Sequence, residues 1–373
     1  RKGGKDAMSI ILSITTDRKP GGIATALHSY SQALSMRGHQ HYVLLPSGSS
    51  AITSLLQLEG VTVVSMPAPL IRLHLLTRGL FSRKLRSAAR AADMLLVHNA
   101  RLTSPARSLG KPVALISHSG KMRHINAADH LVVLTSTAAD RARADLAASG
   151  TPSATGPYIH VIPHGFATAD AKSLTTQAKT DLRVMAAGRF VEKKGFEMLL
   201  AAAAQLEARR VPVQFDLFGD GPIGPVLTHL ARQHALSNVT FHGWQPNLIE
   251  MLDQFDLFCL PSNEEPFGLV IGETMRHGIP MVATQTDGPI DVLGHAGITK
   301  ENTLAAGGLL VATGDAQAMA DAIAFFAADR KALVAAGQAA HKRMASAFSM
   351  SALADRLDLL ITTTSQLPAA GRS

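Results

Sequence analysis

The sequence contains a single cysteine, Cys259, and few aromatic side chains, which make up 5% of its 373 residues. One cysteine excludes a disulfide scaffold and is compatible with a reducing compartment. The scarcity of aromatics argues against a protein that binds nucleic acid by stacking bases, although the sequence pI of about 9.8 favours an anionic partner. No uncharged apolar run reaches the roughly 18–20 residues that a spanning helix requires. The sequence therefore predicts no transmembrane segment.

Apolar residues, in contrast, are abundant and make up 46% of the sequence, and the net charge is +8. The apolar content is sufficient for a packed core, and the length predicts about two domains. Residues 1–166 hold 19 Lys and Arg against 7 Asp and Glu, whereas the remainder holds 17 against 21. The first half is thus expected to face an anionic partner, such as a nucleic acid, an anionic membrane surface or a phosphorylated acceptor. Residues 1–7 lack the apolar run of a secretory signal, and Met8 is the expected native start.

Short apolar segments alternate with helical patterns along both halves of the chain. The expected strands are 9–15, 41–45, 61–65, 94–98, 113–117, 131–135, 183–188, 213–219, 239–242, 257–261 and 280–284. The expected helices are 23–37, 195–207, 223–234, 247–254, 269–277, 316–328, 330–347 and 351–362. Strands that are apolar without alternation are typical of parallel sheets buried on both faces. We therefore predict two doubly wound, Rossmann-like α/β domains, over 8–166 and 167–350, followed by a C-terminal helix and tail over 351–373. The expected seam is the polar stretch 159–179.

The segment RFVEKKG, residues 189–195, follows one expected strand and leads into a helix. Gly188 permits a tight turn, and Arg189 and Lys194 are five residues apart. Helix N-terminal amides and two cations would converge above the carboxyl end of the strand, which favours an anion. An ordinary surface turn with two solvated charges is the alternative.

The segment EEPFGLVIGE, residues 264–273, places two acids around a helix start. Glu273 falls about one turn into the expected helix, where its carboxylate could accept two hydrogen bonds from a vicinal diol such as a ribose. Glu265 precedes the helix and could hold sugar hydroxyls. The amides of residues 267–270 would face a phosphate or sugar oxygen. On the alternative interpretation, Glu264 and Glu265 only complement the helix dipole.

In their order and spacing, these segments resemble family 4 retaining glycosyltransferases of the GT-B fold. The matching stretches are Gly21-Gly22, ISHSG at 116–120, IPHG at 162–165, residues 188–195, FGDGP at 218–222, VTFHG at 239–243 and LPSNEEPFGLVIGETMRHGIPMVAT at 260–284. The resemblance extends over about residues 8–360. It implies two Rossmann-like domains that face each other across a cleft, the first binding the acceptor and the second the nucleotide sugar. It also implies that the C-terminal helix returns toward the N-terminal domain.

The resemblance implies four catalytic residues, His118, Arg189, Lys194 and Glu265. Arg189 and Lys194 would neutralise the donor diphosphate and the charge of the leaving group. Glu265 would hold the donor sugar. His118 would hydrogen-bond sugar hydroxyls or the departing phosphate, and would not act as the base.

The remaining implied residues bind the donor. Gly22 would lie against the diphosphate, where a side chain would collide. Glu273 would bind the ribose. The implied nucleobase contacts are Gly243, Trp244 and Leu248, and the implied backbone contacts to the sugar are Phe267, Gly268 and Leu269.

In retaining members the acceptor hydroxyl attacks the face that the nucleotide leaves, and a diphosphate oxygen takes the proton. The protein then supplies positioning and charge stabilisation. No metal or other cofactor is expected, and the sequence has neither a suitable D-x-D pair nor a zinc-type cluster. The chain departs from the family at His164-Gly165, where Asn-Gly is usual, and at 287–291, where GG-x-P-E is usual. The first departure argues against a role for the hinge-side loop, and the second argues against a donor contact at 287–291.

Residues 70–92 (LIRLHLLTRGLFSRKLRSAARAA) contain six cations and no acid, interspersed with leucines and Phe81. This composition is typical of an interfacial segment attracted to anionic lipid headgroups. The alternative is a solvated helix whose apolar face packs on a sheet. Further candidates for lining a pocket for an anionic acceptor are Arg18, Lys19, Lys121 and Arg123.

We therefore predict a cytoplasmic, retaining, metal-independent hexosyltransferase. It would move a hexose-type sugar from a UDP- or GDP-sugar to an envelope glycan or lipid-linked acceptor, such as lipopolysaccharide core, at the inner face of the cell membrane. The alternative is the same chemistry on a soluble acceptor such as a sugar phosphate or metabolite. A nucleotide-sugar epimerase of the same architecture is disfavoured by the paired acids and cations. A nicotinamide dehydrogenase is disfavoured because no G-x-G-x-x-G follows the first strand, and no nucleic-acid partner is expected.

Overall fold

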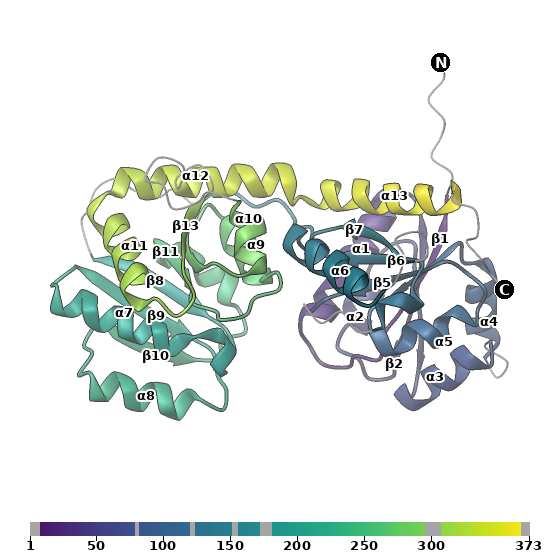
Figure 1. Cartoon of the computed structure of the whole chain (residues 1–373), viewed down its shortest axis with the longest axis horizontal. Coiled ribbons are helices and arrows are strands. Elements are labelled where there is room, and N and C mark those ends of the chain that lie inside the picture. Colours follow the sequence, from purple (N-terminus) through teal and green to yellow (C-terminus); the bar gives the residue numbers. More distant parts are fainter. Residues whose placement is uncertain are drawn as a thin grey trace, which may run out of the picture. The chain divides into compact units, whose positions relative to one another are not determined.

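The computed structural model describes residues 8–78, 82–119, 124–150, 156–171, 181–294 and 307–366. The chain divides into two compact units (Figure 1). The first unit comprises Arg1–Gly165 together with Met350–Ser373, and the second comprises Phe166–Ser349.

The first unit contains a seven-stranded parallel sheet in the order β3-β2-β1-β4-β5-β6-β7. Its strands are β1 (Ile10–Ile14), β2 (Gln40–Pro46), β3 (Val61–Met66), β4 (Met94–Val97), β5 (Val113–Ser117), β6 (His130–Val133) and β7 (Tyr158–Val161). Its helices are α1 (Gly22–Met36), α2 (Ile52–Leu55), α3 (Ala68–Leu76), α4 (Arg83–Ala91), α5 (Thr103–Arg107), α6 (Ser136–Ala148) and α13 (Met350–Gln366), with the 3-10 turns η1 (Ala100–Leu102) and η2 (Ile125–Ala127). The strand order reverses between β1 and β4, which makes the carboxyl ends of these strands the switch point where open α/β sheets bind ligands.

Helices cover both faces of this sheet, which explains why its strands are apolar throughout. On β1, Ile11 packs into a cluster with α1 and α13, whereas its neighbour Leu12 packs into a cluster with α3 and α4. Successive side chains of a strand point to opposite faces, so both clusters require apolar residues.

The C-terminal helix α13 belongs to the first unit. Leu353 and Leu357 of this helix share a buried cluster with Tyr30 and Leu34 of α1. This arrangement confirms the expectation that the C-terminal helix returns to the N-terminal domain.

The second unit contains a six-stranded parallel sheet in the order β10-β9-β8-β11-β12-β13. Its strands are β8 (Leu182–Ala187), β9 (Val213–Phe218), β10 (Val239–Gly243), β11 (Leu257–Leu260), β12 (Met281–Thr284) and β13 (Gly308–Val311). Its helices are α7 (Phe196–Ala208), α8 (Gly224–Gln233), α9 (Leu269–Met275), α10 (Asp287–Leu293), α11 (Ala316–Ala328) and α12 (Arg330–Ala347), with the 3-10 segments η3 (Glu192–Lys194) and η4 (Leu248–Gln254). The strand order here reverses between β8 and β11. The prediction of two Rossmann-like domains is confirmed.

The structure corrects three expectations. The boundary between the two units, after Gly165, falls within the expected seam of 159–179, but this seam starts inside β7, an edge strand that pairs with β6. Residues 172–179 of the seam lie outside the described residues. Strand β13 and helix α10 were not predicted. The stretch 70–92 is not one helix, because α3 ends at Leu76 and α4 begins at Arg83, after its N-cap Ser82.

Candidate functional site

The loops that follow β8 and β11 are joined by hydrogen bonds at the switch point of the second sheet. The backbone N–H groups of Asn263 and Glu264 both donate to the carbonyl of Lys193, at 2.8 and 3.2 Å. The side-chain amide of Asn263 donates to the carbonyl of Glu192 at 3.1 Å. Because these loops are fixed to each other, Lys194 and Glu265 meet although 71 residues separate them.

Lys194 and Glu265 form an ion pair. The Glu265 side chain is only 8% exposed, so the ammonium group compensates a carboxylate that has lost most of its hydration. The stem of Lys194 passes Gly188, since a Cβ atom on this glycine would lie 3.9 Å from the lysine Cδ. The pair thus lies next to the end of β8.

Gly195 fixes the position of this pair. It adopts a φ of 63°, in the left-handed region, and a Cβ atom there would lie 2.1 Å from the carbonyl oxygen of Pro261. The close approach of two backbone segments at this point requires a residue without a side chain.

Replacing Gly195 by alanine is expected to lower the free energy of unfolding by about 3 kcal/mol. Alanine is strained in the left-handed conformation, and its Cβ atom would force the backbone at Pro261 to move away. Gly314 is a matched control in the same unit, with a φ of 78° and no heavy atom within 4 Å of an added Cβ atom. Gly314→Ala should cost about 1 kcal/mol, for the conformation alone. Urea denaturation of both variants measures the difference, and equal losses would contradict the assigned role of Gly195.

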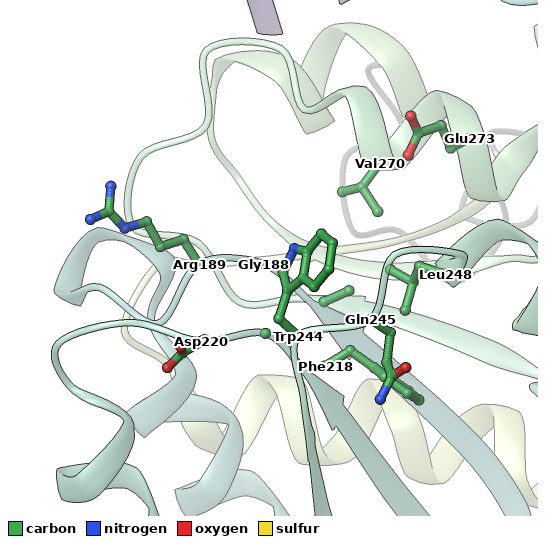
Figure 2. A pocket seen from close by; sticks show the side chains of 11 residues that line it. Gly188, Arg189, Phe218, Asp220, Trp244, Gln245, Leu248, Val270 and Glu273 are labelled. Carbon is green, nitrogen blue, oxygen red and sulfur yellow. The ribbon is translucent and has the colours of Figure 1, made fainter. Parts of the chain in front are cut away.

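A pocket of about 480 Å³ opens at the carboxyl ends of β8 and β9, in the second unit. Its described lining residues are Ala187, Gly188, Arg189, Phe218, Gly219, Asp220, Trp244, Gln245, Leu248, Val270 and Glu273. Figure 2 shows Val270 and Glu273 along helix α9 on one side and Gln245 and Leu248 on another, with the Trp244 ring between them. The Trp244 side chain is 70% exposed, which leaves a large aromatic face available to a flat ligand.

Four of the predicted donor-binding residues line this pocket, namely Arg189, Trp244, Leu248 and Glu273. Gly243 ends β10 immediately before Trp244, with a φ of 67°. Lys194 and Glu265 are not among the described lining residues and lie beside the pocket as the ion pair.

The three residues expected to contribute backbone contacts lie at the start of α9. Phe267 is buried, and its ring stacks on that of Phe166, with centroids 6.3 Å apart. Gly268 is the N-cap residue of α9, and Leu269 is its first residue. The Phe267 side chain therefore anchors the loop in the core.

Glu273 is the fifth residue of α9 and lies one turn into the helix, as predicted. Burial raises the pKa of its carboxyl group, while the nearby Arg276 guanidinium acts in the opposite direction. A carboxylate in this setting has lost hydration and gains from a ligand that donates hydrogen bonds to it.

Sequence reasoning gave no role to the lining residues Phe218, Asp220 and Gln245, and gave Val270 a role only through its backbone amide. The Phe218 ring is buried against the His242 imidazole, with centroids 4.5 Å apart, and His242 Nε2 lies 2.6 Å from Asp216 Oδ1. Phe218 and Asp220 belong to the FGDGP segment, which signals a turn at the end of a strand. Gln245 carries no signal in a single sequence.

The first unit holds the other two predicted residues. Gly22 is the first residue of α1, and His118 directly follows β5. His118 Nε2 lies 2.9 Å from His98 Nδ1, and the His118 ring also stacks on the His164 ring, with centroids 6.1 Å apart. Burial lowers the pKa of His118 to about 4 and that of His164 to about 3, so both rings are neutral at pH 7.

The expected acceptor cations divide into two groups. Lys121 and Arg123 lie outside the described residues, as does Gly120 of the ISHSG segment. Arg18 and Lys19 are exposed but do not line the cavity described for this unit below.

Within the described part of the chain, no group of three or more His, Cys, Asp or Glu side chains is arranged to hold a metal ion. Among the residues that the structure describes, no helix combines the length and the apolarity needed to cross a membrane.

The second unit is similar to known glycosyltransferases. Residues 170–343 match the family model described as glycosyl transferases group 1. The lipopolysaccharide core biosynthesis glycosyltransferase LpsE of Rhizobium meliloti (strain 1021) is 35% identical over 187 residues, which are 50% of this chain and 51% of that protein. The chain thus spans about half, or less, of the length of the curated relatives it matches.

Solved structures match the whole fold. Anabaena HepE in complex with UDP has a TM-score of 0.74 at 18% identity, over 95% of this chain and 100% of that chain. The apo form of the lipopolysaccharide outer core galactosyltransferase WaaB has a TM-score of 0.69 at 15% identity, over 95% and 99%. At such low sequence identity, structural similarity is evidence for the fold only. The fold is that of GT-B glycosyltransferases, as the sequence predicted.

Proposed function

We propose that this protein is a family 4 retaining glycosyltransferase that moves a hexose-type sugar from a UDP- or GDP-sugar to an envelope glycan or lipid-linked acceptor. The observation that carries the proposal is the pocket at the β8–β11 switch point, which combines a guanidinium group, an exposed indole ring and a partly buried helix carboxylate. The region that contains this pocket matches glycosyl transferases group 1, and a protein of the same fold binds UDP. A soluble acceptor, such as a sugar phosphate, is the alternative.

In this proposal the donor lies along the pocket. Its base packs on Trp244 and Leu248, and its ribose hydroxyls donate to Glu273. The diphosphate faces Arg189 and Lys194, whose charges compensate the leaving group. Glu265 and the backbone of residues 267–269 hold the sugar.

We assign the chemistry of transfer to positioning and charge compensation. The acceptor hydroxyl attacks the anomeric carbon on the face that the nucleotide leaves, the bond from that carbon to the diphosphate oxygen breaks, and a diphosphate oxygen takes the hydroxyl proton. His118 would orient a sugar hydroxyl, and Gly22 would allow close approach of the diphosphate. These two roles rest on the sequence resemblance.

The donor alone can test both the retaining stereochemistry and the proposed independence of metal. With UDP-α-glucose or GDP-α-mannose and no acceptor, slow transfer to water should release the α-anomer first, because the entering oxygen keeps the configuration. Proton NMR follows the anomer before it equilibrates. The rate should not change in EDTA, since Arg189 and Lys194 supply the positive charge. Release of the β-anomer, or a loss in EDTA that Mn²⁺ restores, would contradict the proposal.

We further propose that the first unit contacts an anionic membrane at the cytoplasmic face, where a lipid-linked acceptor would be found. Helix α3 exposes Leu70, Leu73 and Leu76, whose side chains are 39%, 47% and 56% exposed. Helix α4 instead buries its apolar residues, Leu85 among them, in the core of the unit and turns cations outward. Exposed leucines beside basic charge favour an anionic bilayer surface.

Exchange of Leu73 and Leu76 for serine is expected to reduce co-sedimentation with vesicles of phosphatidylglycerol and phosphatidylcholine at least tenfold at low salt, because it removes the inserted apolar groups. Leu359→Ser is the matched control, since Leu359 is 66% exposed on α13 of the same unit. Wild-type protein that does not sediment with these vesicles would favour the soluble acceptor.

A further inference from the structure

A second cavity lies within the first unit, at the switch point of its seven-stranded sheet. Its volume is about 820 Å³, and its walls come from the segments after β1, β4 and β5 and from the starts of α3 and η1. Loops at the carboxyl ends of strands around a switch point are the usual ligand sites of open α/β sheets. None of the donor residues assigned in the second unit lines this cavity.

The charge of this cavity is positive. Its described lining residues include Arg72 of α3 and Arg101 of η1, and no Asp or Glu. Neither guanidinium group forms an ion pair or a hydrogen bond with another residue that the structure describes. A guanidinium group binds phosphate and carboxylate with two parallel hydrogen bonds, so two uncompensated arginines at one cavity favour an anion of this kind.

The lining also contains buried hydrogen-bonding atoms. His98 lines the cavity and is only 4% exposed. Its Nδ1 atom pairs with His118, but its Nε2 atom and His118 Nδ1 are buried with no hydrogen-bond partner among the described residues. Leaving buried polar atoms unpaired is unfavourable, and a hydroxyl group can act as donor to one nitrogen and acceptor from another. Burial lowers the pKa of both rings, so each keeps one donor and one acceptor nitrogen at pH 7.

We propose that this cavity binds an acidic sugar acceptor, with its phosphate or carboxylate group on Arg72 and Arg101 and a hydroxyl on His98 and His118. The inference rests on the proposed function, because it gives the acceptor of that reaction a chemical class. A neutral glycan has no group that would compensate the two guanidinium charges.

The test uses the full-length protein and three matched sugars, glucose 6-phosphate, glucuronic acid and glucose, with affinity measured by ligand-observed NMR titration. At least one of the two acidic sugars should bind tenfold or more tightly than glucose, and which one does identifies the anion. Arg72→Gln and Arg101→Gln should each weaken that sugar about tenfold. His98→Ala should weaken the sugar but leave the affinity for inorganic phosphate unchanged.

Arg90→Gln is the control, since it removes the same charge from an exposed position on α4 of the same unit. It should leave the affinities unchanged. Equal binding of all three sugars, or an equal loss in Arg90→Gln and Arg72→Gln, would overturn the inference. Titration with UDP and with GDP separates it from the proposed function. Binding of either nucleotide without acidic-sugar binding refutes the acceptor assignment alone, and acidic-sugar binding with neither nucleotide refutes the donor assignment.

Discussion

Replacement of Lys194 by alanine is expected to lower the rate of sugar transfer by about two to three orders of magnitude, because it removes a positive charge from the leaving diphosphate. It should also destabilise the second unit by about 3–5 kcal/mol, since the Glu265 carboxylate, only 8% exposed, loses its cation. Transfer kinetics and urea denaturation measure the two effects.

Binding experiments separate the two roles of Lys194. Lys194→Ala should bind UDP more weakly than the wild type but bind uridine equally well, because only the diphosphate faces the ammonium group. Glu265→Gln breaks the ion pair and leaves the ammonium group in place, so it should retain UDP affinity. Lys193→Ala, at an exposed neighbouring position, is the control for both stability and affinity. If Lys194→Ala bound UDP as tightly as the wild type, Lys194 would have only a structural role, as the ion-pair partner of Glu265.

Glu273→Gln is expected to weaken UDP binding on the order of a hundredfold, because two charge-assisted hydrogen bonds to the ribose become weaker neutral ones. The sharpest comparison uses 2′-deoxy-UDP, which lacks one of these hydroxyls. Wild-type protein should bind UDP much more tightly than the deoxy nucleotide, and Glu273→Gln should bind the two nearly alike. Glu264→Gln, at an exposed position on the preceding loop, is the matched control. Full discrimination by Glu273→Gln would refute the ribose assignment.

The pKa of Glu273 adds a pH dependence to this prediction. Burial raises this pKa, so the carboxylate takes up a proton at a higher pH than an ordinary glutamate. UDP affinity should therefore fall as the pH drops through the raised pKa. The free energy of unfolding changes in the opposite sense, because the folded state binds the proton of Glu273 more tightly than the unfolded state does. The stabilising contribution of protonated Glu273 is therefore lost as the pH rises from the unfolded-state pKa through the folded-state pKa. At pH 7, Glu273→Gln should therefore gain stability while it loses affinity.

Apolar patterning was enough to predict most of the fold. Strands such as β4 and β11 are buried on both faces, so their sequences are apolar runs that stand out from their surroundings. Strand β7 lies at the edge of its sheet and reads YIHV, without such a run, and the expected linker extended into it. Helix α10 begins with Asp-Gly-Pro, which is typical of a turn.

The position of a site residue could be predicted where it depends only on the helix or loop that carries the residue. Glu273 on the first turns of α9 and Arg189 after β8 could be placed from the strand–loop–helix order. The pairing of Lys194 with Glu265 could not, because it depends on hydrogen bonds between two loops and on the adjacency of β8 and β11. The contact of His98 with His118 likewise depends on neighbouring strands of the first sheet, and nothing in the sequence around His98 signals it.

A crystal structure of the protein with bound UDP-glucose or GDP-mannose gives the most direct test of the donor site. The account predicts a base packed on Trp244 and Leu248, ribose hydroxyls within hydrogen-bonding distance of Glu273, and a diphosphate at Arg189 and Lys194. A nucleotide bound at any other position on the second unit would contradict it.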